Sequence, residues 1–345
     1  MIESFEIEGG VTLRGYRTSG SRPGPHVLIT AGIHGSEYPG ILAARKLRAF
    51  LAEADIAGTV TVLPLCNPSA LKGRAKAIFP EDGKNLNRMF PGNPEGSASE
   101  KTAWAITQLQ DEADFYIDLH GGDLFEKLTP YVYVPGNCAP EVTTTARAAA
   151  QVLSVPVRVL SQASTGAYNS AALRGTPSIL IERGACGLWE PEEVEAYFED
   201  LKALFAHLGI IDGKAPVNTA QREAPFATYL SHSEFGLWFP RVKAGDDVLK
   251  GDLLGHLEDF EGAVLAQIHA PHDGRILYMT ATLAALRPGR PGIKRSVRKH
   301  LCAVLQSAEK PKCRRQPNVQ TADDGVSFLW ANTSAQLCVI RQSFA

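Results

Sequence analysis

The sequence has few cysteines, and none of them belongs to a disulfide-type pattern. Its six cysteines are scattered over 345 residues, with no CxxC pair and no dense framework. This usage favours a reduced, cytoplasmic setting over a disulfide scaffold. The first residues, Met1 to Glu6, include acids and lack the basic-then-apolar layout of a secretory signal. We therefore expect a cytoplasmic protein.

Long apolar runs and an excess of one charge are also missing. No stretch approaches the roughly 20 apolar residues that cross a bilayer. The formal net charge is −2, which gives no electrostatic reason to expect nucleic acid or a membrane surface as a partner. Gly83-Lys84 is not a phosphate loop, because the glycine-rich run and the following Ser/Thr are absent. The remaining composition, 44% hydrophobic and 21% charged, is that of an ordinary globular protein.

From the start to about residue 213, strand-like and helix-like segments alternate. This alternation predicts an α/β domain in which helices flank a mainly parallel or mixed central sheet. The length is sufficient for more than one domain. The predicted strands are Val27–Ala31, Thr59–Leu65, Phe115–Leu119, Tyr131–Val134, Val155–Leu160 and Ser178–Ile181, and the predicted helices are Ile41–Glu53, Glu100–Glu112, Glu141–Leu153 and Glu192–Leu208.

The pattern changes after residue 213. Residues 214–286 contain short strands separated by turn glycines and predict a smaller C-terminal all-β domain. Such modules occur in biotinyl and lipoyl carriers, but the expected hairpin tip, 258–262, has no lysine to modify, so a structural or gating role is favoured. Residues 287–345 begin with a strongly basic segment without periodicity, and we expect a poorly ordered tail.

Two histidines and a glutamate follow predicted strands. His34 and Glu37 lie in the sequence His34-Gly-Ser-Glu37 behind the first of these strands, and His120 ends another apolar run. Ligands bind outside the carboxyl ends of strands in open α/β sheets, and zinc hydrolases use three protein ligands. We predict one zinc site at His34, Glu37 and His120, with Asp118 orienting His120. The alternative is a capped turn whose side chains are solvated.

A second carboxylate, Glu182, ends the predicted strand Ser178–Ile181. Burial of an acid is costly unless it has a purpose or a partner. Glu182 is the candidate general base, which would take a proton from the attacking water and deliver it to the leaving amine. An ion pair with the adjacent Arg183 is the alternative role.

The polar loop around Asn87 and Arg88 suits substrate binding. Arginine presents a planar fork to carboxylates, and a neighbouring asparagine adds a donor. Asn87 and Arg88 would therefore clamp a substrate carboxylate. Arg74 is a candidate for stabilising the negative charge that develops on the scissile carbonyl oxygen. Lys76 competes with it for this role, and a solvated basic loop is a third possibility.

The motifs His34-Gly-Ser-Glu37, Asn85-Leu-Asn-Arg88, Asp118-Leu-His120 and the strand-end Glu182 occur in one order. In this respect the chain resembles the succinylglutamate desuccinylase/aspartoacylase family, a branch of the M14 zinc carboxypeptidase-like hydrolases. The resemblance covers about residues 25–286. It implies zinc bound by His34, Glu37 and His120, a carboxylate clamp at Asn87 and Arg88, and Glu182 as base.

The resemblance also implies a reaction, the hydrolysis of the amide bond of a small N-acyl amino acid or related acylated amine. This is a linear amide rather than a peptide bond. The alternatives are a metallocarboxypeptidase acting on peptides and a catalytically silent binding protein of the same fold. The expected partner is the small acylated substrate, and a homo-oligomer remains open.

Overall fold

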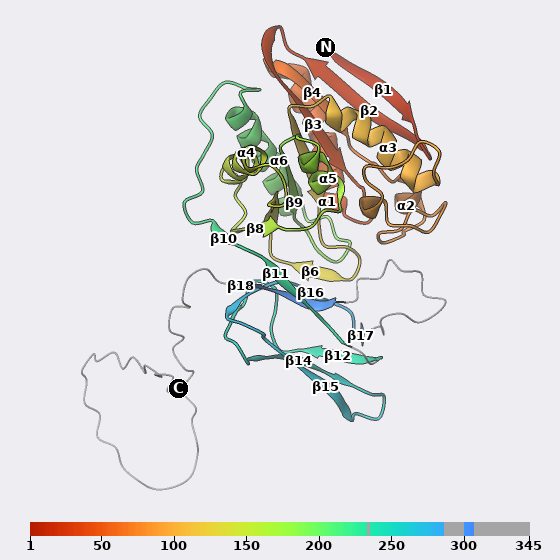
Figure 1. The fold of residues 1–345 in the computed structure, drawn as a ribbon, viewed down its shortest axis with the longest axis vertical. Helices are drawn as coiled ribbons and strands as arrows, with labels where there is room; N and C mark the ends of the chain where they lie inside the picture. Colours follow the sequence, from red (N-terminus) through yellow and green to blue (C-terminus); the bar gives the residue numbers. More distant parts are fainter. Residues whose placement is uncertain (233–234, 286–299, 307–345) are drawn as a thin grey trace, which may run out of the picture. The chain divides into compact units, whose positions relative to one another are not determined.

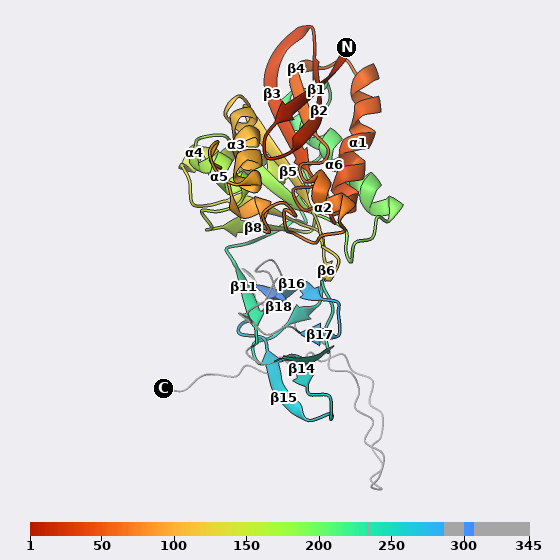
Figure 2. The same ribbon diagram turned by 90° about the vertical axis from the view of Figure 1, so that its right-hand side faces the viewer.

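The computed structural model describes residues 1–232, 235–285 and 300–306 (Figures 1 and 2). Within these residues, a nine-stranded sheet has the order β1-β2-β4-β3-β5-β9-β7-β8-β10. Its strands are β1 (Ile2–Glu8), β2 (Thr12–Ser19), β3 (Arg22–Ala31), β4 (Ala57–Leu63), β5 (Phe115–His120), β7 (Tyr131–Pro135), β8 (Val157–Ser161), β9 (Ser178–Glu182) and β10 (Arg222–Ala224).

The sheet is mixed, as predicted. Its centre is parallel, since β3 pairs in this way with β4 and β5, and β5 with β9. The β1–β2, β2–β4 and β7–β9 pairs are antiparallel. The six predicted strands correspond to β3, β4, β5, β7, β8 and β9, whereas the amino-terminal hairpin β1–β2 was not predicted.

Helices cover both faces of this sheet (Figure 1). One face packs against α1 (Tyr38–Glu53), α4 (Pro140–Ala150) and α6 (Pro191–Leu208), and the other against α3 (Ala98–Asp111) and α5 (Ala167–Leu173). The short helices α2 (Pro68–Lys72) and η1 (Leu86–Arg88) follow β4. Side chains alternate along a strand: Ile117 and Leu119 of β5 face α1 and α6, and Tyr116 faces α3 and α5. Asp118 and His120 therefore share the α3/α5 face.

The carboxyl-terminal part of the described chain is all β, as predicted, and we call strands β11 to β18 the β-module. One sheet has the order β11-β18-β16-β13, and the other has the order β15-β14-β12-β17. The strand β6 (Glu126–Leu128), which follows β5 in the chain, pairs with β16. The β-module strands are β11 (Ala227–Ser231), β12 (Gly236–Pro240), β13 (Asp247–Val248), β14 (Leu253–Glu258), β15 (Val264–His269), β16 (Gly274–Thr280), β17 (Ala284–Ala285) and β18 (His300–Gln306).

The strand β18 lies inside the segment 287–345, for which the sequence pattern indicated no regular element. It pairs with both β11 and β16, so it occupies the middle of its sheet. The rest of the predicted tail lies outside the described residues, and the division at 213 and 286 stays a prediction. In the described part of the chain, no helix combines the length and the apolar character of a membrane span.

Candidate metal centre

The first two predicted ligands lie between the end of β3 and the start of α1. After Ala31 the chain turns at Gly32, whose φ of +64° favours glycine over residues with a side chain. His34 and Glu37 are then buried, with exposed fractions of 3% and 1%. Proline in the first turn of α1 favours a helix start just after Glu37. The Glu37 side chain does not cap the helix, so it is available for the site.

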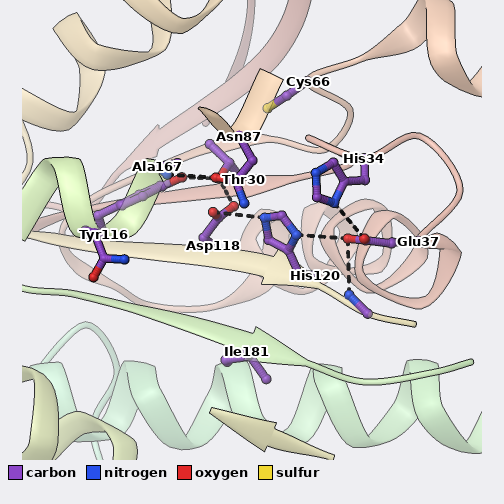
Figure 3. A network of polar contacts seen from close by, with 12 residues as sticks. Thr30, His34, Glu37, Cys66, Asn87, Tyr116, Asp118, His120, Ala167 and Ile181 are labelled. Atoms are coloured by element: carbon purple, nitrogen blue, oxygen red, sulfur yellow. Dashed lines mark hydrogen bonds and ion pairs between the residues drawn. The ribbon is translucent and has the colours of Figure 1, made fainter. Parts of the chain in front are cut away.

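The third predicted ligand, His120, converges with these two (Figure 3). His34 Nδ1 lies 2.7 Å from Glu37 Oε1, and His120 Nδ1 lies 2.9 Å from Glu37 Oε2. All three candidate ligand atoms lie within 4.8 Å of one another. The backbone N–H of Gly121 also donates to Glu37 Oε2, at 3.2 Å. Residues 34, 37 and 120 thus form one compact cluster around the Glu37 carboxylate.

The outer nitrogens of both imidazoles face oxygen atoms. His120 Nε2 lies 3.1 Å from Asp118 Oδ2, which is the contact expected from the sequence, and His34 Nε2 lies 3.2 Å from Asn85 Oδ1. An oxygen acceptor places the ring proton on Nε2 and leaves the Nδ1 lone pair for a metal. The sequence reasoning missed Asn85, although it belongs to the same Asn-Leu-Asn-Arg motif as the predicted clamp.

Asp118 belongs to a buried polar network with Thr30 and Tyr116 (Figure 3). Thr30 Oγ1 donates to Asp118 Oδ1 at 2.7 Å and lies 2.6 Å from the Tyr116 hydroxyl. All three residues are fully buried. A buried carboxylate is tolerated when its oxygens have hydrogen-bond partners. Asp118 therefore has a fixed position from which to orient the His120 ring.

The cluster shifts the pKa values of its own members. Burial alone would raise the pKa of Glu37, but the His34 and His120 imidazoles outweigh burial and hold it well below its usual value. Burial alone would lower the pKa of His120, but the Asp118 and Glu37 carboxylates raise it well above its usual value. Both shifts favour the charged forms, a carboxylate at Glu37 and an imidazolium at His120, when no metal is bound.

The donor set fits a zinc ion. Two imidazole nitrogens and one carboxylate oxygen match the protein ligands of catalytic zinc sites, which keep another position for water. Both Nδ1 atoms point at the Glu37 carboxylate, so a cation among the three would take the place of the proton between them and add one positive charge, which the Glu37 and Asp118 carboxylates would offset. The outer hydrogen bonds to Asp118 and Asn85 favour the tautomers that such binding requires.

Glu182 lies beside this cluster. In the parallel pairing of β5 with β9, Glu182 stands opposite His120, so their Cα atoms are about 5 Å apart. Leu180, two residues earlier, belongs to the α3/α5 core, so Glu182 faces the same side of the sheet as His120. The side chain is buried. The adjacent Arg183 forms an ion pair with Asp200 of α6, at 2.8 Å.

The predicted clamp lies on η1. Asn87 is buried, and its Oδ1 accepts the Ala167 backbone N–H at 2.8 Å (Figure 3). Its amide N–H groups are therefore the part that a carboxylate could contact. Arg88 is exposed. Burial raises the pKa of Tyr168 on α5, and the positive charge of Arg88 is close enough to oppose this rise. The structure thus connects the clamp residues to the start of α5.

Arg74 and Lys76 lie in different environments. Arg74 is exposed, with a φ of +48°. Lys76 Nζ forms an ion pair of 2.7 Å with Asp123, and both side chains are at least nine-tenths buried. Asp123 follows His120 by three residues, and the Ser36 hydroxyl donates to the Lys76 carbonyl at 3.1 Å. Lys76 is therefore tied to both ligand-bearing loops.

Comparison with known proteins shows which family this chain resembles. A model of the succinylglutamate desuccinylase/aspartoacylase catalytic domain matches residues 23–208. The N-alpha-acetyl-L-2,4-diaminobutyric acid deacetylase of Halomonas elongata is 30% identical over 262 residues, covering 73% of this chain and 76% of that protein.

Solved structures share the fold. A succinylglutamate desuccinylase/aspartoacylase from Rhodobacter sphaeroides superposes with a TM-score of 0.76 at 23% identity, over 87% of this chain and 90% of that one. The product-bound ectoine utilization protein EutE (DoeB) from Ruegeria pomeroyi gives 0.76 at 22% identity, over 89% and 95%. The family match spans more than half of the sequence. The chain therefore belongs to the succinylglutamate desuccinylase/aspartoacylase family.

Proposed function

We propose that this protein is a zinc-dependent hydrolase that cleaves the amide bond of a small N-acyl amino acid. One observation carries the proposal: the His34–Glu37–His120 cluster has a second buried carboxylate, Glu182, beside it on the same face of the sheet. A three-ligand centre with an adjacent base is an arrangement that catalytic zinc sites use for hydrolysis.

Each residue of the cluster has a role in this proposal. His34, Glu37 and His120 hold one Zn²⁺ per subunit, and Asp118 and Asn85 orient the two imidazoles. When bound, such an ion polarises a carbonyl and makes water a better nucleophile at neutral pH. Glu182 accepts a proton from the attacking water and delivers it to the leaving amine.

The substrate contacts follow from the loops around the centre. Arg88 and the amide N–H groups of Asn87 bind the carboxylate of the amino acid. Lys76 is a better candidate than Arg74 for stabilising the negative charge that develops on the carbonyl oxygen, because the Lys76 side chain is buried and Arg74 is exposed. Asp123 keeps the Lys76 ammonium in place.

The acyl group and the amine are proposed from a relative. The Halomonas elongata protein is named for an acetylated diamino acid, so N-acetyl amino acids are the first substrates to test, and N-succinyl amino acids the second. We also propose a cytoplasmic location, which agrees with the free thiols of the described cysteines Cys66, Cys138, Cys186 and Cys302.

The position of the β-module supports a small substrate over a peptide. The Tyr229 hydroxyl of β11 lies 2.6 Å from that of Tyr133 on β7. The pKa of Tyr133 is raised well above its usual value, mainly by burial and then by the Tyr229 hydroxyl. The Glu182 carboxylate contributes more weakly to the same rise. A β-module strand therefore reaches the neighbourhood of the base, where an extended peptide would need open space. The complete set of ligands, base and clamp argues against a silent binding protein.

The test is Glu182→Gln, with Glu192→Gln as its control, because Glu192 is an exposed residue in the first turn of α6. We expect the E182Q enzyme to lose roughly 10²- to 10⁴-fold in kcat on N-acetyl amino acids. Zinc content should stay at one ion per chain in both variants. Peptides with a free carboxyl terminus serve as competing substrates. A zinc-loaded protein that cleaves only these peptides, or an E182Q enzyme with full activity, would refute the proposal.

A further inference from the structure

Tyr197 of α6 lies beneath the ends of the two strands that carry the site. It is fully buried. Its hydroxyl is hydrogen-bonded to the backbone carbonyl of His120 and, at 2.8 Å, to that of Ile181. His120 is a proposed metal ligand, and Ile181 immediately precedes the proposed base, Glu182. One hydroxyl thus joins the backbones of the ligand strand and the base strand.

The Tyr197 contact lies at the end of the paired strands β5 and β9. The pairing of β5 with β9 runs from Tyr116–Ser178 to its last matched residues, His120 and Glu182. The ends of paired strands are where backbone hydrogen bonds open most easily. The Tyr197 hydroxyl engages the carbonyls of His120 and of Ile181, the residue before Glu182, and so links the two strand ends beside the 3.3 Å hydrogen bond from the Arg183 N–H to the His120 carbonyl.

Tyr197 acts from the opposite side of the sheet. It packs with Leu119 and Ile181 in the α1/α6 core, whereas His120 and Glu182 face α3 and α5. Figure 3 shows the Ile181 side chain directed away from the His120 cluster. The Arg183 guanidinium lies 5.9 Å from the centre of the Tyr197 ring and is itself held by Asp200. The hydrogen bonds of Tyr197 to the two strands therefore go to backbone carbonyls and not to the His120 or Glu182 side chains.

We infer that Tyr197 is a positioning residue that sets the spacing between the metal ligand His120 and the base Glu182. This inference rests on the proposed function. Loss of the hydroxyl would leave two buried carbonyls at the strand ends without this donor, and both strands would relax. The metal ligands and the base would then no longer be held in their mutual geometry.

A purely structural role is the alternative, and Tyr16 provides a matched control. Tyr16 is also buried, and its hydroxyl donates to the Ala44 carbonyl at 2.5 Å. Tyr16 lies on β2 and Ala44 on α1, seven residues after Glu37, so neither partner belongs to β5 or β9. Tyr16→Phe therefore removes the same type of hydrogen bond without touching β5 or β9.

The experiment compares Tyr197→Phe with Tyr16→Phe in the full chain. We expect Y197F to weaken zinc binding by the metal-free protein about 10- to 100-fold and to lower kcat by a similar factor, with KM within about twofold. Y16F should lower the thermal midpoint by a similar amount, yet keep zinc affinity and kcat within about twofold. If Y197F stays within twofold in zinc affinity, or if Y16F loses as much as Y197F, the inference is overturned.

Zinc affinity is measured by competition with a chelator and needs no substrate. If the wild-type protein binds zinc but hydrolyses no acylated amino acid, the proposed function fails, and the affinity comparison still decides the role of Tyr197. Tyr197→Leu and Tyr16→Leu form a second pair in case a Phe variant does not fold. The Y197L protein must bind zinc more weakly than the Y16L protein, and equal affinities would overturn the inference.

Discussion

Replacement of Asp118 by Asn tests whether the Asp118 carboxylate strengthens metal binding by the His120 imidazole. Asp118 is fully buried, with Oδ2 3.1 Å from His120 Nε2 and Oδ1 2.7 Å from Thr30 Oγ1. The amide has nearly the same shape, so the variant removes the negative charge and creates no cavity. A hydrogen bond to a charged group contributes about 1.5–3 kcal/mol. Because about 1.4 kcal/mol corresponds to a tenfold change in affinity, we expect zinc binding to weaken roughly 10- to 100-fold.

The assay is zinc competition with a chelator on metal-free protein, with circular dichroism to confirm folding. Thr30→Val gives a graded comparison, because it removes only a neutral donor from Asp118 and should weaken zinc binding less than D118N does. A folded D118N protein whose zinc affinity is within twofold of wild type would refute the reasoning. So would a T30V protein that loses more affinity than D118N.

Three further outcomes follow from the same contacts. In the metal-free protein, burial lowers the pKa of His120, but Asp118 and Glu37 raise it well above its usual value. The protonated His120 therefore stabilises the folded state fully below about pH 6.5, and this contribution is lost as the pH rises through the raised pKa. Thermal melts of chelator-treated protein should therefore show a falling midpoint above that pH, and a flat profile would contradict the assignment. Lys76→Met leaves the buried Asp123 carboxylate without its cation and should lower the free energy of unfolding in urea by about 3 kcal/mol. Arg74→Ala changes an exposed residue and should alter the free energy of unfolding by less than about 0.5 kcal/mol. Equal losses in the two variants would rule out the buried ion pair. Arg88→Ala should raise KM for N-acetyl amino acids about tenfold or more while leaving zinc affinity unchanged, and an unchanged KM would remove Arg88 from the clamp.

Much of the α/β architecture was readable from local patterns. The predicted helix Glu192–Leu208 lies within α6, and the predicted strand Phe115–Leu119 differs from β5 by one residue. Short, apolar, β-branched runs identify buried strands, and a proline followed by acids identifies a helix start. The hairpin β1–β2 was not predicted, because β1 has no buried residue and β2, although half of its residues are buried, is largely polar in sequence. The strand β18 was missed because it follows a long basic segment without periodicity.

The sequence by itself was sufficient to propose which residues carry the chemistry. Strand-end positions and flanking glycines were sufficient to select His34, Glu37, His120 and Glu182, because parallel strands bring their carboxyl ends to one edge. Only the tertiary structure decided what holds them there: Asn85 behind His34, Tyr197 beneath the strand ends, and Asp200 as the partner of Arg183. These partners come from distant segments, and their contacts depend on strand register and helix packing, which no local periodicity records.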